Sequence, residues 1–188
     1  MWSMKQFLAS LVEILEIAFI AIASVFIIRT FLLQPFLVSG ASMEPNFSSD
    51  DYLLIDELTY RLREPERGEV VVFRYPFNES VYYIKRIIGL PGEKVIVKNG
   101  LVTIVNQDAP QGFLVKEEYL PRGLITGGNE EVTLGPSEYF VMGDNRPASS
   151  DSRAWGPVPK KDIIGLARLR LWPLTKATAF ETPSYQTN

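Results

Sequence analysis

Apolar residues dominate one stretch near the start of the chain, and the pattern changes after it. Residues 7–38 are mostly Phe, Leu, Ile, Val and Ala, whereas the later chain mixes charged residues with glycines and prolines. The uninterrupted uncharged part, residues 17–28, is shorter than the roughly 20 residues that cross the hydrocarbon layer of a bilayer. Extending it to 13–33 reaches that length, with Arg29 near one end, where its long side chain can reach the headgroups. We therefore expect one N-terminal transmembrane helix within an anchor region of residues 1–38.

Other interpretations of this apolar stretch remain open. A cleavable secretory signal also begins with a basic residue, here Lys5, and Ser39-Gly40-Ala41 has the small-x-small form of a cleavage site. Glu13 and Glu16 argue against a signal, because they interrupt what would be its apolar core. The helix could also lie in the membrane interface or be buried in the domain. The length of the apolar stretch favours the transmembrane helix.

The rest of the chain carries short apolar runs separated by turn residues, which is typical of a mostly β fold. The runs are rich in β-branched and aromatic residues, and glycine, proline and asparagine separate them. The expected strands are 52–56, 69–75, 81–90, 138–142 and 163–172. A hairpin is expected over 94–105, because Asn99-Gly100 tolerates the positive φ angles of a two-residue type I′ turn.

These strands predict one β domain over residues 39–174, followed by a polar C-terminal tail over 175–188. The segment from about 89 to 138 lies between two strands of the expected sheet and has its own hairpin and glycine-rich loops. We interpret it as a small β insertion, which a fold tolerates because loop-closure entropy grows only logarithmically with length. The sequence assigns no chemistry to the insertion.

Composition excludes several kinds of chemistry. The 188 residues include no histidine and no cysteine, which removes an imidazole base, a thiol nucleophile and the usual zinc ligands. We therefore expect no metal and no cofactor. The net charge is -3, from 19 basic and 22 acidic residues, and no long basic run occurs, so nucleic acid is not an expected partner. Any reaction must use hydroxyls, carboxylates, lysine or arginine.

One serine stands in a tight turn at the start of the expected β domain. The segment Ser39-Gly40-Ala41-Ser42-Met43-Glu44-Pro45 follows the apolar stretch directly. Taken alone, it is more often an ordinary turn than a catalytic site, because serine, glycine and proline are common turn residues. A nucleophilic Ser42 also needs a base. Without histidine, the candidates are a lysine or a carboxylate held close in space.

Lys85 is the candidate base. Strand alternation places it on one face with Val81, Tyr83 and Ile87, so its neighbours are apolar. Burial disfavours the charged amine and can lower a lysine pKa by about 3 to 5 units from its usual value near 10.4. A fold must supply about 1.4 kcal/mol for each unit. The alternative is a lysine that reaches solvent from a sheet edge, and only one of Lys85 and its neighbour Arg86 needs to be inside.

A third polar segment follows the strand expected at 138–142. Its sequence is Gly143-Asp144-Asn145-Arg146-Pro147-Ala148-Ser149-Ser150-Asp151-Ser152-Arg153. Such polar density suits a loop whose side chains bond one another, with Asp151 and Arg153 as a charge-assisted pair. The Ser149 hydroxyl could orient a neutral lysine. Calcium is a weak rival for this loop, because the acidic residues lack the EF-hand spacing and its closing glutamate.

These three segments, in this order after an apolar helix, resemble the bacterial type I signal peptidases. Ser42-Met43-x-Pro45 is similar to the family's nucleophile motif, Tyr83-Ile84-Lys85-Arg86 to its lysine motif, and the segment from Gly143 to Arg153 to its last motif. The resemblance covers nearly the whole chain. It implies a membrane-bound serine endopeptidase with a Ser-Lys dyad, a mostly β catalytic domain with a small β insertion, and catalysis on the outer face of the cytoplasmic membrane. The implied substrates are signal peptides of exported preproteins, cut after small residues.

The resemblance also assigns roles. Ser42 attacks the scissile carbonyl, Lys85 accepts its proton, and Ser149 holds the lysine amine. The backbone N–H of Ser42 helps to stabilise the oxyanion. Some family members have a serine two residues before the nucleophile, where this chain has Gly40, so that side-chain donor is missing. Supporting residues, which perform no chemistry, are expected at Asp144, Asp151 and Arg153.

The partners expected from this resemblance are signal peptides and the lipid bilayer. A second hypothesis keeps the same fold but gives up catalysis. Because Gly40 removes a donor, the chain could be a catalytically impaired, membrane-anchored β module for binding or scaffolding. A soluble, self-cleaving Ser-Lys regulator is disfavoured by the apolar stretch and by the lack of a DNA-binding half.

Overall fold

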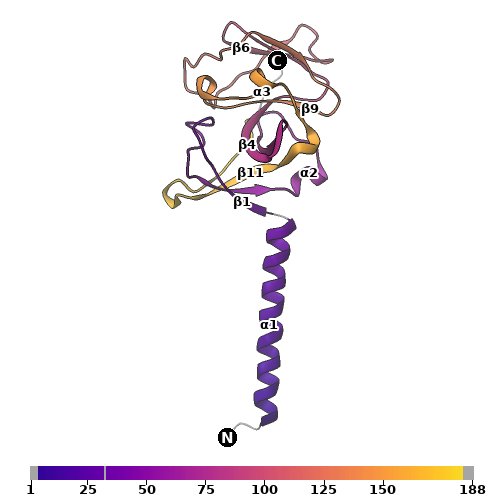
Figure 1. Cartoon of the computed structure of the whole chain (residues 1–188), viewed down its shortest axis with the longest axis vertical. Helices are drawn as coiled ribbons and strands as arrows, with labels where there is room; N and C mark the ends of the chain where they lie inside the picture. Colours follow the sequence, from indigo (N-terminus) through magenta and orange to yellow (C-terminus); the bar gives the residue numbers. More distant parts are fainter. Residues whose placement is uncertain (1–3, 32, 184–188) are drawn as a thin grey trace.

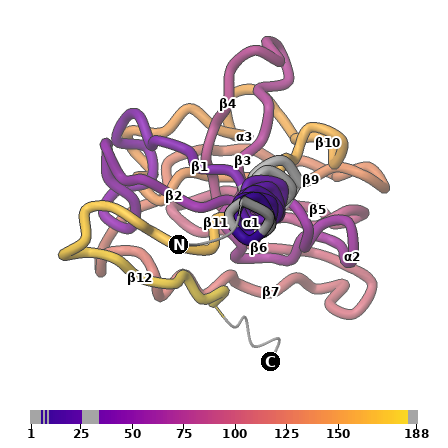
Figure 2. The backbone as a smooth tube through the Cα atoms, turned by 90° about the horizontal axis from the view of Figure 1, so that it is seen from below, coloured from indigo at the N-terminus to yellow at the C-terminus, as the bar shows by residue number. Residues whose placement is uncertain are grey.

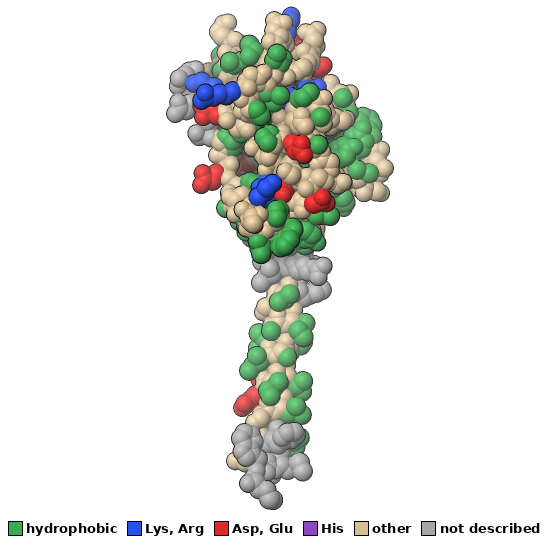
Figure 3. Space-filling view, turned by 90° about the vertical axis from the view of Figure 1, so that its left-hand side faces the viewer, with side chains coloured by type: hydrophobic (Ala, Val, Ile, Leu, Met, Phe, Trp, Pro, Cys, Tyr) green, Lys and Arg blue, Asp and Glu red, His purple; other side chains and the backbone are tan. Residues whose placement is uncertain are grey.

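One long helix leads into a body built mainly of β-strands (Figure 1). A computed structural model describes residues 4–31 and 33–183 of the chain. The helix α1, Met4–Phe31, projects away from the β body and keeps large apolar side chains exposed, among them Ile17, Phe19 and Ile22. Such side chains cover much of its visible face in Figure 3. Within the residues described, no helix combines the length and apolarity needed to cross a membrane, so the predicted transmembrane helix is not confirmed.

The strands form a large and a small sheet, which makes the fold mostly β as expected. The large sheet has eight strands in the order β1-β2-β11-β3-β4-β9-β10, with β12 paired to β11. Its strands are β1 Leu33–Leu37, β2 Tyr52–Asp56, β3 Val70–Tyr75, β4 Asn78–Gly89, β9 Glu138–Met142, β10 Val158–Pro159, β11 Ile163–Trp172 and β12 Thr178–Ala179. Two short α-helices, α2 Thr59–Leu62 and α3 Ser152–Trp155, and three 3-10 turns, Arg146–Ala148, Lys160–Asp162 and Leu174–Lys176, complete the body.

The expected strands are confirmed, with one extension. The strands expected at 52–56, 138–142 and 163–172 have the bounds of β2, β9 and β11. β4 begins at Asn78 rather than at residue 81, because its hairpin with β3 continues to the pair Tyr75↔Asn78. This hairpin protrudes from the body in Figure 2.

The small sheet lies within the segment interpreted as an insertion. Its order is β7-β6-β5-β8, with β5 Lys94–Lys98, β6 Leu101–Val105, β7 Phe113–Leu114 and β8 Glu130–Thr133. Asn99 and Gly100, between β5 and β6, have φ angles of 54° and 82°, as the predicted hairpin requires. One buried apolar cluster joins this sheet to the large one, with Val95 and Ile104 packed together with Phe140. The insertion is therefore fixed to the body through a shared core.

Two strands lie in ranges where no strand was expected. β1 falls within the expected anchor region 1–38, but its five register pairs with β2 make it part of the large sheet. β12 falls within the expected tail 175–188 and pairs with β11. The large sheet thus includes one strand before and one strand after the expected domain 39–174, and the loop that follows β1 carries the candidate serine.

Candidate functional site

Ser42 lies in the loop that connects β1 to β2. Gly40 precedes it with a φ of +96°, a left-handed conformation that glycine adopts without strain. After Ser42 the backbone makes one tight turn, in which the Phe47 N–H donates to the Met43 carbonyl at 2.9 Å. The side chains of Met43 and Phe47 are each only 1% exposed, so they anchor this turn in the core. The serine is therefore presented from a loop whose apolar members are buried.

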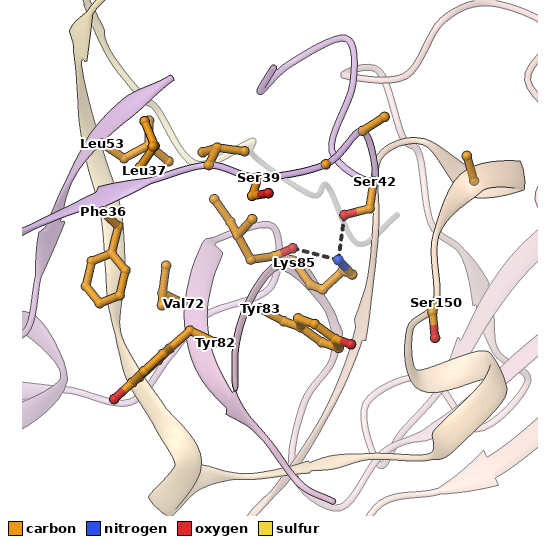
Figure 4. A pocket seen from close by; sticks show the side chains of 15 residues that line it. Phe36, Leu37, Ser39, Ser42, Leu53, Val72, Tyr82, Tyr83, Lys85 and Ser150 are labelled. Carbon is orange, nitrogen blue, oxygen red and sulfur yellow. Dashed lines mark hydrogen bonds between the residues drawn. The ribbon is translucent and has the colours of Figure 1, made fainter. Parts of the chain in front are cut away.

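Lys85 reaches the Ser42 hydroxyl from the middle of β4. Its Nζ atom lies 2.6 Å from Ser42 Oγ and donates a second hydrogen bond, 2.9 Å long, to the Ile84 carbonyl. Figure 4 shows the two side chains pointing toward one another. Lys85 is 4% exposed, and the ring centre of Tyr83 is 5.3 Å from its amine. Two residues 43 positions apart are thus brought into direct contact.

The surroundings of Lys85 favour its uncharged form. Burial lowers the pKa of the Lys85 amine from 10.5 to about 8, because the charged form loses solvation. The negative charges of Asp151 and Asp144 act in the opposite direction and limit the fall of this pKa. With this pKa, about a tenth of the amine is neutral at pH 7, far more than for an ordinary lysine, and the neutral form is the one that can act as a base for a serine hydroxyl.

Ser149 does not hold the lysine amine as expected. Among the residues that the structure describes, no hydrogen bond joins Ser149 to Lys85, whose amine is held by Ser42 and by a main-chain carbonyl. The Ser149 hydroxyl instead lies near Asp151 and helps to lower the pKa of that carboxyl. Ser149 packs closely on Gly143, where an added Cβ would lie 2.6 Å from Ser149 Cβ and nearer still to the Ser42 carbonyl oxygen. Gly143 therefore allows the nucleophile loop and Ser149 to approach each other.

The expected pairing of Asp151 with Arg153 is present. Arg153 donates from Nε and from a terminal nitrogen to the two oxygens of Asp151, at 2.8 and 2.7 Å. The Gly143 N–H donates to the same carboxylate at 3.0 Å. Burial alone would raise the pKa of Asp151, but these hydrogen bonds outweigh it and hold the pKa below its ordinary value. The charged carboxylate thus fixes the backbone that contacts Ser42.

Lys85 and Arg86 are both buried, which corrects the expectation that one of them serves the surface. Arg86 is 5% exposed and Asp144 is fully buried, and two hydrogen bonds of 2.8 and 2.6 Å join them. Asn46, four residues after the candidate nucleophile, donates to Asp144 at 2.8 Å. Alternation places Arg86 on the opposite face of β4 from Lys85, and that face is also covered. The ion pair joins residues 58 positions apart, so no local pattern indicated it.

Asn145 and Arg146 contact the site and were missed as site residues. The Asn145 N–H donates to the Ser42 carbonyl and its side-chain amide donates to the Ala41 carbonyl, both at 3.0 Å. Arg146 is 2% exposed and donates to Glu117 at 2.7 Å, which ties this loop to the insertion. Polar density marked the segment, but the sequence could not show that its partners lie in distant segments.

A cleft opens beside the Ser42–Lys85 pair (Figure 4). Its volume is about 360 Å³. Its walls are mainly apolar and aromatic, and they include Phe36, Val38, Leu53, Val72, Tyr82, Tyr83 and Ile84. Phe36 lies in β1, an edge strand of the large sheet, and Val38 directly follows that strand. In the described part of the chain, no three acidic side chains gather in a way that could hold a metal ion.

A serine hydroxyl bonded to a buried lysine, at the side of an apolar cleft in a β fold, defines a hydrolase class that needs no histidine. Comparison with known proteins gives the family. Residues 11–172 match the family described as "Signal peptidase, peptidase S26". The chain belongs to this family and is a serine endopeptidase.

Two relatives with this family's name support the assignment. The chain is 39% identical over 158 residues to "Probable signal peptidase I-2" of Synechocystis sp., covering 79% of this chain and 67% of the relative. It is 32% identical over 182 residues to "Signal peptidase I P" of Bacillus subtilis subsp. natto, covering 92% of this chain and 95% of the relative. A crystal structure of a signal peptidase I from Enterococcus faecalis V583 is 28% identical and has a TM-score of 0.46, covering 55% of this chain and 97% of that one.

Proposed function

We propose that this endopeptidase removes signal peptides from exported preproteins with a Ser42–Lys85 dyad. The observation that carries the proposal is the 2.6 Å hydrogen bond between Ser42 Oγ and the buried Lys85 amine. A lysine whose pKa is lowered to about 8 can act as a base near neutral pH. The names of the relatives, which call them signal peptidases, support the substrate class.

In the proposed reaction, neutral Lys85 accepts the proton of Ser42 as the hydroxyl attacks the scissile carbonyl. The lysine then gives that proton to the leaving amine, and water hydrolyses the acyl-enzyme with the same lysine as base. The Ser42 N–H stabilises the oxyanion. Gly40 offers no side-chain donor, so a backbone N–H near it is the proposed second donor. Ser149 contributes by packing, while Asp144, Asp151 and Arg153 support the site without performing chemistry.

The cleft suits an extended peptide. β1 is the last strand of the large sheet, and its end lines the cleft together with Tyr82 to Ile84 of β4. A substrate segment can therefore add to this edge by main-chain hydrogen bonds, with alternate side chains directed into the apolar wall. We propose that the limited volume beside Ser42, about 360 Å³ for the whole cleft, favours small residues before the cut.

We also propose that α1 ties the enzyme to the cytoplasmic membrane, with the β domain on the outer face. Support comes from the exposed apolar side chains along this projecting helix, including Ile17, Phe19 and Ile22, which are 68%, 72% and 70% exposed. Lipid would cover surface that is unfavourable in water. Holding enzyme and signal peptide in one bilayer would raise their effective concentration.

The test is cleavage of a purified signal-bearing preprotein by the full-length enzyme. Ser42→Ala and Lys85→Met are expected to abolish cleavage while the far-ultraviolet circular dichroism stays unchanged. Ser137→Ala and Lys98→Met, at two exposed positions that do not line the cleft, are the matched controls and should cleave normally. Full cleavage by either dyad variant would refute the dyad. Preprotein binding without turnover by the unaltered chain would instead favour the scaffold hypothesis.

A further inference from the structure

The C-terminal segment after β11 packs against the back of the nucleophile loop. The family match ends at residue 172, yet the chain continues through the 3-10 turn Leu174–Lys176 into β12 and Phe180. β12 pairs with β11, and the Phe180 N–H donates to the Arg168 carbonyl at 2.9 Å. Figure 2 shows this terminal segment lying along the body, on the side where α1 enters. The segment is therefore a fixed part of the fold.

Phe180 contacts the aromatic anchor of the loop that carries Ser42. The ring centres of Phe180 and Phe47 are 4.3 Å apart, with 36° between the ring planes. Phe47 belongs to the same buried cluster as Met43, the residue directly after Ser42. Phe180 packs on the outside of this cluster and is itself only partly buried. It is thus the outer layer of the packing that holds the turn after the nucleophile.

Arg170 of β11 joins the two rings and holds the same loop by polar contacts. Its guanidinium carbon lies 5.3 Å from the ring centre of Phe180 and 5.8 Å from that of Phe47. It donates to the Asn46 carbonyl and forms a 2.9 Å ion pair with Asp51. The loop is therefore held at Asn46, Phe47 and Asp51 by β11 and the terminal segment. At Ser42 it is held by the contacts with Asn145 and Lys85.

We propose that Phe180 is a positioning residue for the reaction, because its packing on Phe47 sets the place of Ser42 relative to Lys85. This inference rests on the proposed dyad. The Phe47 N–H donates to the carbonyl of Met43, the residue directly after Ser42, so a loss of packing behind Phe47 is passed on to Ser42 through this hydrogen bond. A shift of about 1 Å at reacting atoms can slow a reaction on the order of 100-fold.

The experiment compares Phe180→Ala with Phe113→Ala in the full-length enzyme. Phe113 is a matched control, because it is also half-buried, lies at the margin of a buried cluster and has an arginine, Arg67, 5.5 Å from its ring centre. It lies in the insertion, away from the dyad. We expect Phe180→Ala to lower kcat roughly 10- to 100-fold with KM changed by less than about threefold. Phe180→Leu should recover most of kcat, and Phe113→Ala should stay within about threefold of the unaltered enzyme.

A second measurement separates this inference from the proposed function. Nitrogen NMR of the Lys85 amine reports its titration whether or not the enzyme cleaves the chosen preprotein. If Phe180 positions the loop, Phe180→Ala loosens the cover over Lys85, and its pKa rises from about 8 toward 10.5, with Asp144 and Asp151 still in place. Phe113→Ala should leave this titration unchanged. An unchanged titration and kcat in Phe180→Ala would overturn the inference, whereas absence of cleavage by the unaltered enzyme would overturn only the proposed function.

Discussion

The buried Lys85 amine predicts an enzyme that is less stable than its own inactive variant. Burial depresses the pKa of folded Lys85 to about 8, while the unfolded chain has the ordinary value of 10.5. Binding a proton to the Lys85 amine is therefore less favourable in the folded chain than in the unfolded chain. At pH values below 8, this difference between the two pKa values lowers the free energy of unfolding by about 3 kcal/mol, at 1.36 kcal/mol for each pKa unit. Because Lys85 is only 4% exposed, little of this is screened by solvent.

The sign of the pH dependence follows from the same two values. Between pH 8 and 10.5 the unfolded chain binds more protons than the folded one, so the free energy of unfolding rises with pH. Lys85→Met removes this titration. At about pH 6.5 the free energy of unfolding of the variant should exceed that of the unaltered enzyme by about 3 kcal/mol. The loss of the hydrogen bonds of the amine reduces this gain. At about pH 10 the titration contributes less than about 1 kcal/mol.

Urea unfolding at both pH values measures this difference. Lys98→Met, at an exposed position beside the β5–β6 turn, is the control and should shift the two curves by equal amounts. The quantity to compare is the difference in unfolding free energy between Lys85→Met and the unaltered enzyme. This difference should be about 2.5 kcal/mol larger at the lower pH than at the higher pH. If the stability difference between Lys85→Met and the unaltered enzyme is the same at both pH values, the amine is not desolvated in solution and the reasoning about the base fails.

Three further predictions concern activity and the support of the site. Cleavage measured as kcat/KM should rise with pH and level off above about 8, because the amine of Lys85 must be neutral; a flat profile from about pH 6 to 9 would contradict this. Gly143→Ala should lower kcat on the order of 100-fold, since the new Cβ displaces the carbonyl of the nucleophile, whereas Gly127→Ala, where a Cβ meets nothing within 4 Å, should not. Asp144→Asn removes the carboxylate that neutralises the buried Arg86 and should lower the free energy of unfolding in urea by about 3 to 5 kcal/mol; a loss below about 1 kcal/mol would show that this ion pair is dispensable.

Local pattern was sufficient for most strands of this fold. The bounds expected for β2, β9 and β11 match because apolar alternation and turn residues are local signals, and Asn99-Gly100 specified its own turn. β1 was hidden because its apolar residues continue the apolar composition of the preceding helix. β12 has only two residues, and pairing with β11 rather than its own sequence makes it a strand.

The candidate site also contains residues that the sequence could identify and residues that it could not. Ser42 and Lys85 were chosen from residue chemistry and motif resemblance, and the structure places them in contact. The orienting bond expected from Ser149 is not formed among the described residues, where the Lys85 amine bonds the Ser42 hydroxyl and the Ile84 carbonyl. Arg86 and Asn145 depend on partners about 60 to 100 residues away in the chain, which no local pattern specifies.

The buried guanidinium of Arg146 makes the small sheet part of the enzyme rather than an accessory. Its charge is neutralised by Glu117 of the insertion, and Thr126 of the same segment accepts a further hydrogen bond from it at 2.5 Å. Excising residues 89–138 would strip this cation of its counter-ion within the loop that borders the serine. A chimaera that exchanges this segment between related enzymes must therefore keep a carboxylate opposite Arg146, or the hybrid will be less stable than either parent.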